Sequence, residues 1–228
     1  PIWWQTTVAS AGNVTSAIYT AFGKPFNERN KELLGVPFAQ FLKLNSEFRY
    51  HWRMDRNNSV ATRFAAGIIW SYGNATTAPY TEQFYIGGAN SLRAFTVRSI
   101  GPGTYNPAGN NKYGYLDQTG DIKLEANVEY RFPIFGDLYG ATFLDAGNVW
   151  LMRKDENRPG GEFSLKNLAK SLAVNTGVGV RYDLTFLVIR LDLGIALHVP
   201  YETGKSGYYN IPKFKDGLGF HFAIGYPF

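Results

Sequence analysis

Apolar and polar residues alternate with a period of two along most of this chain. In residues 41–54, Leu42 and Phe48 belong to an apolar series, whereas Lys43, Glu47 and Arg49 belong to the intervening charged series. Successive side chains of a β-strand point to opposite faces, so this pattern predicts a strand with one apolar and one charged face. Alternation also marks residues 60–72, 122–132, 174–182, 187–197 and 218–228, and more weakly 2–8, 13–22 and 139–150. These six strong and three weak segments predict nine strands.

The predicted connections alternate between short turns and long loops. The short ones are residues 9–12, 55–58, 133–137 and 183–184, and the long ones are 23–37, 73–120, 151–172 and 198–217. This layout is typical of outer-membrane β-barrels, and the strand lengths suit the roughly 9–11 tilted residues that cross a bilayer. The sequence therefore predicts an all-β fold, an antiparallel transmembrane β-barrel.

The predicted strand count has a consequence for the two ends of the chain. In bacterial barrels the short turns face the periplasm, and an even number of strands places both termini there. Nine strands would place Phe228 on that side and Pro1 on the opposite side. We therefore expect residues 1–228 to be the C-terminal part of a larger barrel. Its N-terminal strands and any periplasmic domains would come from sequence outside this chain or from a complementary chain.

Composition argues against several other functions. The net charge of +5 is spread along the chain without a basic block, which gives nucleic-acid binding little support. The chain has no cysteine, and His51, His198 and His221 are too far apart for a metal-ligand motif. No serine occupies a nucleophile elbow. We therefore expect neither an enzyme nor a metal or other cofactor.

An irregular, glycine-hinged segment lies inside the longest predicted loop. It contains the turn Gly87-Gly88, followed by Arg93 and the aromatic Phe95. An arginine on a loop that folds back into a barrel needs carboxylate partners there. Taken singly, Arg93 is more simply a solvated loop arginine, and the glycine pair is an ordinary turn.

The strands on the C-terminal side of this loop offer such partners. Alternation places Glu129, Phe143, Asp145 and Gly147 on the inner face of neighbouring strands. A guanidinium pairs with carboxylates through two parallel hydrogen bonds, which fix geometry as well as charge. We expect Arg93 to meet both carboxylates, with Gly147 leaving room for the loop. The predicted role is that of a latch between loop and wall. The charged residues Arg181, Arg190 and Asp192 are interpreted as ordinary polar lining of the barrel interior.

At these residues the chain resembles the BamA/TamA (Omp85) superfamily. Leu92-Arg93-Ala94-Phe95 is similar to the family's [VI]-R-G-[FY] loop motif, with Ala94 at the usual glycine position. Phe143-Leu144-Asp145-Ala146-Gly147 matches its F-x-D-x-G motif, and Glu129 stands, as in the family, shortly before a proline-containing turn. The resemblance implies about sixteen strands in the complete barrel and an inward-folding extracellular loop over residues 73–120.

The end of the chain resembles the family's terminal β-signal. The matching positions within residues 217–228 are Gly219, Phe222, Ile224 and Phe228, whereas Gly217 stands at a position that is usually polar. The resemblance implies an assembly or insertion factor in the bacterial outer membrane, which opens sideways where its first and last strands meet. A client strand would add there by β-augmentation. The implied partners are outer-membrane lipids, unfolded outer-membrane protein clients and accessory assembly subunits.

Three other functions fit part of the pattern. An Omp85-type secretion pore would pass one dedicated partner to the surface. A passive diffusion channel would conduct ions steadily and would not depend on Arg93. A structural adhesin barrel would bind a surface ligand through its long loops.

Overall fold

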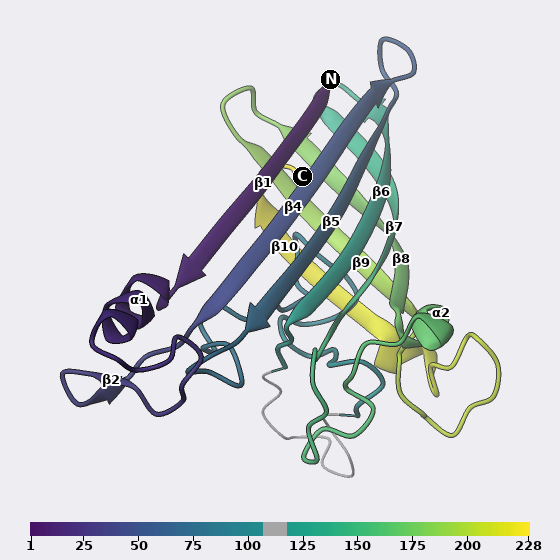
Figure 1. Cartoon of the computed structure of the whole chain (residues 1–228). Helices are drawn as coiled ribbons and strands as arrows, with labels where there is room; N and C mark the ends of the chain where they lie inside the picture. Colours follow the sequence, from purple (N-terminus) through teal and green to yellow (C-terminus); the bar gives the residue numbers. More distant parts are fainter. Residues whose placement is uncertain (107–117) are drawn as a thin grey trace.

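The computed structural model describes residues 1–106 and 118–228, and its main feature is one antiparallel sheet of eight strands (Figure 1). The strands are β1 (Ile2–Ala11), β4 (Phe41–Arg53), β5 (Ser59–Ser71), β6 (Ile122–Phe135), β7 (Leu138–Trp150), β8 (Ala173–Asp183), β9 (Val188–His198) and β10 (Leu218–Ile224). They pair in this order, from β1 at one edge to β10 at the other. The predicted fold class, barrel-type antiparallel strands, is confirmed.

The sheet is open within the described residues. The strands are tilted and the sheet curls, so that β8–β10 lie behind β1 and β4 in Figure 1. Neither β1 nor β10 pairs with another strand on its outer side among residues 1–106 and 118–228. Each of these edges therefore presents backbone groups that another strand could pair with.

One of the nine predicted strands is wrong. The segment predicted as strand 13–22 instead forms helix α1 (Asn13–Ala21), which follows Gly12 in a left-handed conformation with φ of 74°. The apolar residues Val14, Ile18 and Phe22 recur at intervals of four, so this short segment fits a helical period as well as a strand period. The loop continues through a small hairpin of β2 (Glu32–Leu33) and β3 (Val36–Pro37), and β1 pairs directly with β4.

The change from nine strands to eight also corrects the position of the N-terminus. The short turns join β4 to β5, β6 to β7 and β8 to β9, and Pro1 lies at this same end of the sheet (Figure 1). The carbonyl oxygen of Pro1 accepts a hydrogen bond from the backbone N–H of His51, close to the first of these turns. The expectation that Pro1 would lie on the opposite side is therefore wrong, and the odd strand count no longer supports a larger barrel.

The long connections gather at the other end of the sheet (Figure 1). The connection between β7 and β8 contains the 3-10 helix η1 (Leu165–Asn167) and helix α2 (Leu168–Ser171), and a second 3-10 helix, η2 (Phe214–Gly217), precedes β10. No helix among the described residues combines the length and apolar character needed to cross a membrane.

The two faces of the sheet differ as the alternation predicts. Apolar side chains such as Leu144, Val178 and Phe222 are exposed on the convex face, which we call the outer face. Glu129 and Asp145 are completely buried on the concave, inner face. The β5–β6 connection covers them. Its apolar residues join a hydrophobic core that includes Phe41, Ile69, Phe84, Ile86, Leu92, Phe95, Ile100 and Val149. Residues 107–117 of the predicted loop 73–120 lie outside the described residues.

Candidate functional site

The Gly87-Gly88 turn shapes the loop that approaches the inner face. Both glycines have positive φ, 98° and 92°, a conformation that L side chains rarely adopt. The N–H of Gly88 donates to the carbonyl oxygen of Phe95 at 2.8 Å, and the N–H of Gly87 donates to Ser91 Oγ at 3.0 Å. A Cβ on Gly87 would overlap the carbonyl oxygen of Thr96. The turn closes tightly because these two positions have no side chain.

This turn delivers Arg93 to the two carboxylates that alternation selected. Its Nε and Nη2 donate to Asp145 Oδ2 and Oδ1 at 2.9 and 2.8 Å, and its backbone N–H also donates to Oδ2 at 3.2 Å. Nη1 pairs with Glu129 Oε2. The guanidinium carbon lies 3.5 Å from the centre of the Phe143 ring, which adds a cation–π contact. All three charged side chains are 0% exposed.

The protonation of Arg93 follows from these contacts. Burial lowers the pKa of the guanidinium, but the hydrogen bond and charge of Asp145, together with those of Glu129, outweigh it and raise the pKa above the ordinary arginine value. Arg93 therefore stays a cation inside the fold and acts as a fixed positive charge.

Amide side chains complete the coordination of Asp145. Asn127 on β6 donates to Asp145 Oδ1 at 3.0 Å, and Asn175 on β8 donates to Oδ2 at 3.0 Å. Asn127 also donates to the carbonyl oxygen of Ser91, which ties the loop backbone to the same cluster. Asp145 thus accepts three hydrogen bonds from Arg93 and one from each amide, so it has no free site for proton transfer chemistry.

Glu129 is the centre of a wider set of arginines. Arg131 Nε donates to its Oε1 at 2.7 Å, and Arg181 Nη2 donates to its Oε2 at 2.9 Å. Arg181 also donates to Asp192 Oδ1 at 2.5 Å, which extends the network to β9. Asn127, Asn175 and Arg181 are functional-site residues that the sequence pattern alone does not identify. The alternation placed all three on the inner face, but only the strand register shows which of them face the loop.

Gly147 and Phe95 also lie at the loop. A Cβ on Gly147 would stand 2.7 Å from the carbonyl oxygen of Leu124 on β6 and 3.3 Å from Leu92 Cδ1, so this glycine borders both the neighbouring strand and the loop. Leu92 is fully buried and Phe95 is 8% exposed, both in the core cluster. Every residue predicted for the loop contact therefore lies in one region of the fold.

The predicted terminal strand is shorter in the structure. β10 ends at Ile224, where the prediction continued to Phe228. Gly225 has φ of 85° and residue 227 is a proline, which has no N–H to donate to a ladder. Phe222 and Ile224 point outward and are more than half exposed, and Gly219 lies on the inner side. The ring of Phe228 turns inward, with its centre 6.0 Å from the Arg93 guanidinium carbon.

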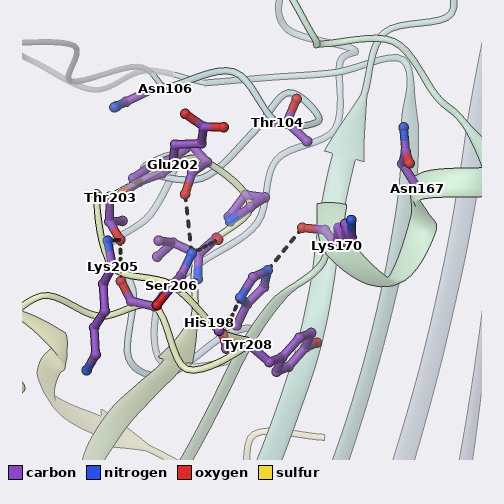
Figure 2. Close-up of a pocket in the computed structure, with 16 residues that line it drawn as sticks. Thr104, Asn106, Asn167, Lys170, His198, Glu202, Thr203, Lys205, Ser206 and Tyr208 are labelled. Atoms are coloured by element: carbon purple, nitrogen blue, oxygen red, sulfur yellow. Dashed lines mark hydrogen bonds between the residues drawn. The ribbon is translucent and has the colours of Figure 1, made fainter.

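A separate cavity of about 1060 Å³ opens among the long loops. Figure 2 shows His198 on its wall beside Tyr208, with Lys170 of helix α2 nearby. The imidazole stacks on Tyr208 at 4.3 Å between ring centres, and its Nδ1 and Nε2 lie 2.6 and 3.0 Å from the carbonyl oxygens of Tyr208 and Lys170. His198 therefore joins the β9–β10 connection to helix α2. No cluster of three or more potential metal ligands occurs in residues 1–106 and 118–228.

Comparison with known proteins places these features in a family context. The model of the Omp85 superfamily domain matches residues 18–228. Sorting and assembly machinery component 50 homolog A of Xenopus laevis is 27% identical over 180 residues, which are 77% of this chain and 37% of that protein. Outer membrane protein assembly factor BamA of Neisseria meningitidis is 34% identical over 90 residues, which are 37% of this chain and 11% of that protein.

A solved structure shows a similar fold. The crystal structure of BamA from Haemophilus ducreyi lacking POTRA domains 1–3 matches with a TM-score of 0.55 at 17% identity, covering 81% of this chain and 35% of the matched chain. The matched part of the chain thus spans little more than a third of the length of the Xenopus protein and of the BamA structure, and about a tenth of the Neisseria protein.

Proposed function

The chain belongs to the Omp85 superfamily, and from this membership we propose that it forms part of the barrel wall of a factor that assembles or inserts outer-membrane proteins. The names of its relatives support this proposal, because both BamA and component 50 of the sorting and assembly machinery are named for assembly. Those names describe assembly factors rather than enzymes, and the proposal requires no cofactor. The relatives come from vertebrates as well as bacteria, so we propose an outer membrane without assigning it to a bacterium.

The observation that carries the proposed mechanism is the buried pairing of Arg93 with Asp145 and Glu129. The pairing holds the β5–β6 loop against β6 and β7, and removing one partner of such a buried pair typically costs about 3–5 kcal/mol. We propose that this loop acts as the latch that keeps the barrel wall in a defined shape while its edge strands change partners.

The proposed site of client entry is the free edge of β10. This strand has 7 residues, whereas its neighbour β9 has 11, so fewer ladder hydrogen bonds hold it. A client strand could add to this edge through backbone hydrogen bonds, with outward residues such as Phe222 in contact with lipid. The edge of β1 would be closed by further strands of the native protein or by a complementary chain.

The other functions predict different behaviour. A secretion pore of the same superfamily would share the loop pairing but would act on one exported partner. The passive diffusion channel gains less support, because Leu92, Arg93 and Phe95 bury the loop against the wall where an open channel needs water.

Reconstitution of the native protein tests the proposal. Unfolded client barrels would be added to liposomes that contain the wild-type protein, the Arg93→Ala variant or no protein, and folding would be followed by protease protection and heat-modifiable gel mobility. We expect the wild-type protein to accelerate client folding and Arg93→Ala to reduce that acceleration. Equal folding in protein-free liposomes would refute the assembly function, and steady ion conductance in both proteins would favour the channel.

A further inference from the structure

Three glycines on adjacent strands form a row across the inner face. Gly177 on β8 is the register partner of Gly194 on β9, which in turn is the partner of Gly219 on β10. The last two of them meet the tip of the β5–β6 loop. A Cβ on Gly194 would overlap the carbonyl group of Arg93, and a Cβ on Gly219 would lie 2.7 Å from the carbonyl oxygen and 2.8 Å from the Cα of Ala94.

Backbone conformation does not explain these glycines. Neither Gly194 nor Gly219 has a positive φ, so an alanine could adopt the same backbone angles. A glycine in a strand interior weakens the strand and often marks a place where another backbone approaches closely. The obstacles at both positions are backbone atoms of the loop, which cannot turn aside as the end of a flexible side chain can.

A second contact fixes the same part of the loop to β9. Arg190 Nη2 donates to Asn90 Oδ1 at 2.6 Å, while Arg63 Nη1 on β5 donates to the carbonyl oxygen of Asn90 at 3.0 Å. Asn90 therefore links β5 to β9, two strands that are four positions apart in the order of the sheet. The loop therefore meets β9 at two points along the strand, Arg190 and Gly194. Arg190 is the register partner of Ala223 on β10.

We propose that Gly194 and Gly219 form a seat for the loop tip, and that through this seat the loop positions the terminal strand. The inference rests on the proposed function and adds a physical connection between the Arg93 latch and the edge at which clients would enter. Arg93 holds the loop to β6 and β7, and the next residue, Ala94, rests on β10. Movement of β10 away from β9 would remove the surface beneath Ala94, and release of the loop would leave β10 unsupported on its inner side.

The seat gives Gly219 a second role. The family resemblance assigns this residue to the terminal β-signal, whereas the structure shows it in contact with the loop backbone. Gly194 lies on β9, outside the β-signal, and touches the same loop. A comparison of the two glycines therefore separates loop seating from signal recognition.

The experiment compares Gly194→Ala, Gly219→Ala and a control, Gly140→Ala, in the purified native protein. Gly140 is a β7 glycine whose added Cβ would meet the ring of Phe132 rather than the loop. Hydrogen exchange of the peptide covering residues 85–96 is measured by mass spectrometry. We expect both seat variants to speed its exchange on the order of tenfold relative to the control, because local opening of the loop becomes easier.

The Arg93→Ala background supplies a second criterion. If the added methyl groups act through the loop, they should have little further effect once the latch has been removed, because contacting residues are energetically coupled. Arg93→Ala alone should also speed exchange in β10 more than in β4, a measurement that needs no glycine variant to fold.

Two results would overturn the seat. One is loop exchange in Gly194→Ala that equals the Gly140→Ala control. The other is exchange in β10 of the Arg93→Ala variant that rises no more than exchange in β4. Client insertion is scored separately, so faster loop exchange with unchanged insertion would support the seat and count against the proposed function.

Discussion

Arg93 and Asp145 lie 52 residues apart in the sequence and are joined by three hydrogen bonds inside the fold. One bond comes from the backbone and two come from the guanidinium, so the carboxylate fixes the position of the loop backbone as well as the orientation of the side chain. Because both side chains are completely buried, neither charge can turn to water if its partner is lost.

The first prediction concerns this pair. Arg93→Ala and Asp145→Ala should each lower the free energy of unfolding by about 3–5 kcal/mol, because the remaining charge stays buried without its partner. The measurement is denaturant unfolding of the native protein in detergent. Arg56→Ala provides the control, since Arg56 is an exposed arginine in the short β4–β5 turn.

The reversed pair extends this test. A combined Arg93→Asp and Asp145→Arg variant should recover part of the loss, but not all of it, because Glu129 would then face a carboxylate in place of a guanidinium. Single variants with the stability of Arg56→Ala would show that the pair does not hold the loop.

The second prediction concerns the turn that introduces the loop. Gly87→Ala should destabilise the loop by about 1–3 kcal/mol, because an alanine there would combine an unfavourable positive φ with a clash against Thr96. Gly88→Ala separates the two causes, since Gly88 in the same turn also has a positive φ but its added Cβ would meet only the flexible side chain of Val97. Limited proteolysis within residues 85–96 provides the measurement. Equal cleavage in the two variants would show that the contact with Thr96 adds nothing.

The sequence alone was enough to predict most of the sheet and the centre of the site. Alternation identified the strands because the two faces of this sheet meet different surroundings, and it placed Glu129 and Asp145 on the inner face. It failed at residues 13–22, where Val14, Ile18 and Phe22 suit a helix as well as a strand. Alternation shows which face a residue occupies but does not show which residues of neighbouring strands stand opposite. For this reason Arg181 and Asp192 were interpreted as general lining, although Arg181 binds Glu129 directly.

The third prediction concerns Glu129, which pairs with three arginines. Glu129→Gln keeps the shape of the side chain but removes its charge, so Arg93, Arg131 and Arg181 would face one another with less compensation. We expect a loss of stability that exceeds that of Glu28→Gln, an exposed loop control. Combined with Arg93→Ala, the loss should be smaller than the sum of the single losses, because the two residues share one network. Strict additivity in denaturant unfolding would indicate that the arginines act independently of Glu129.

The fourth prediction concerns His198, which lies at the loop end of the sheet and away from the latch. His198→Phe keeps an aromatic ring to stack on Tyr208 but removes both ring nitrogens, and with them the contacts to the carbonyl oxygens of Tyr208 and Lys170. A neutral imidazole can donate to only one of these oxygens, and a phenyl ring to neither, so the β9–β10 connection should loosen from helix α2.

The expected result is faster protease cleavage within residues 199–213, with client insertion unchanged, since no contact of His198 reaches Arg93 or β10 in the part of the chain that the structure describes. Lys213→Ala, an exposed position in the same connection, should not alter cleavage. A loss of client insertion in His198→Phe that matches Arg93→Ala would instead mean that the long loops and the latch work as one unit. The assembly mechanism would then have to include the cavity around His198.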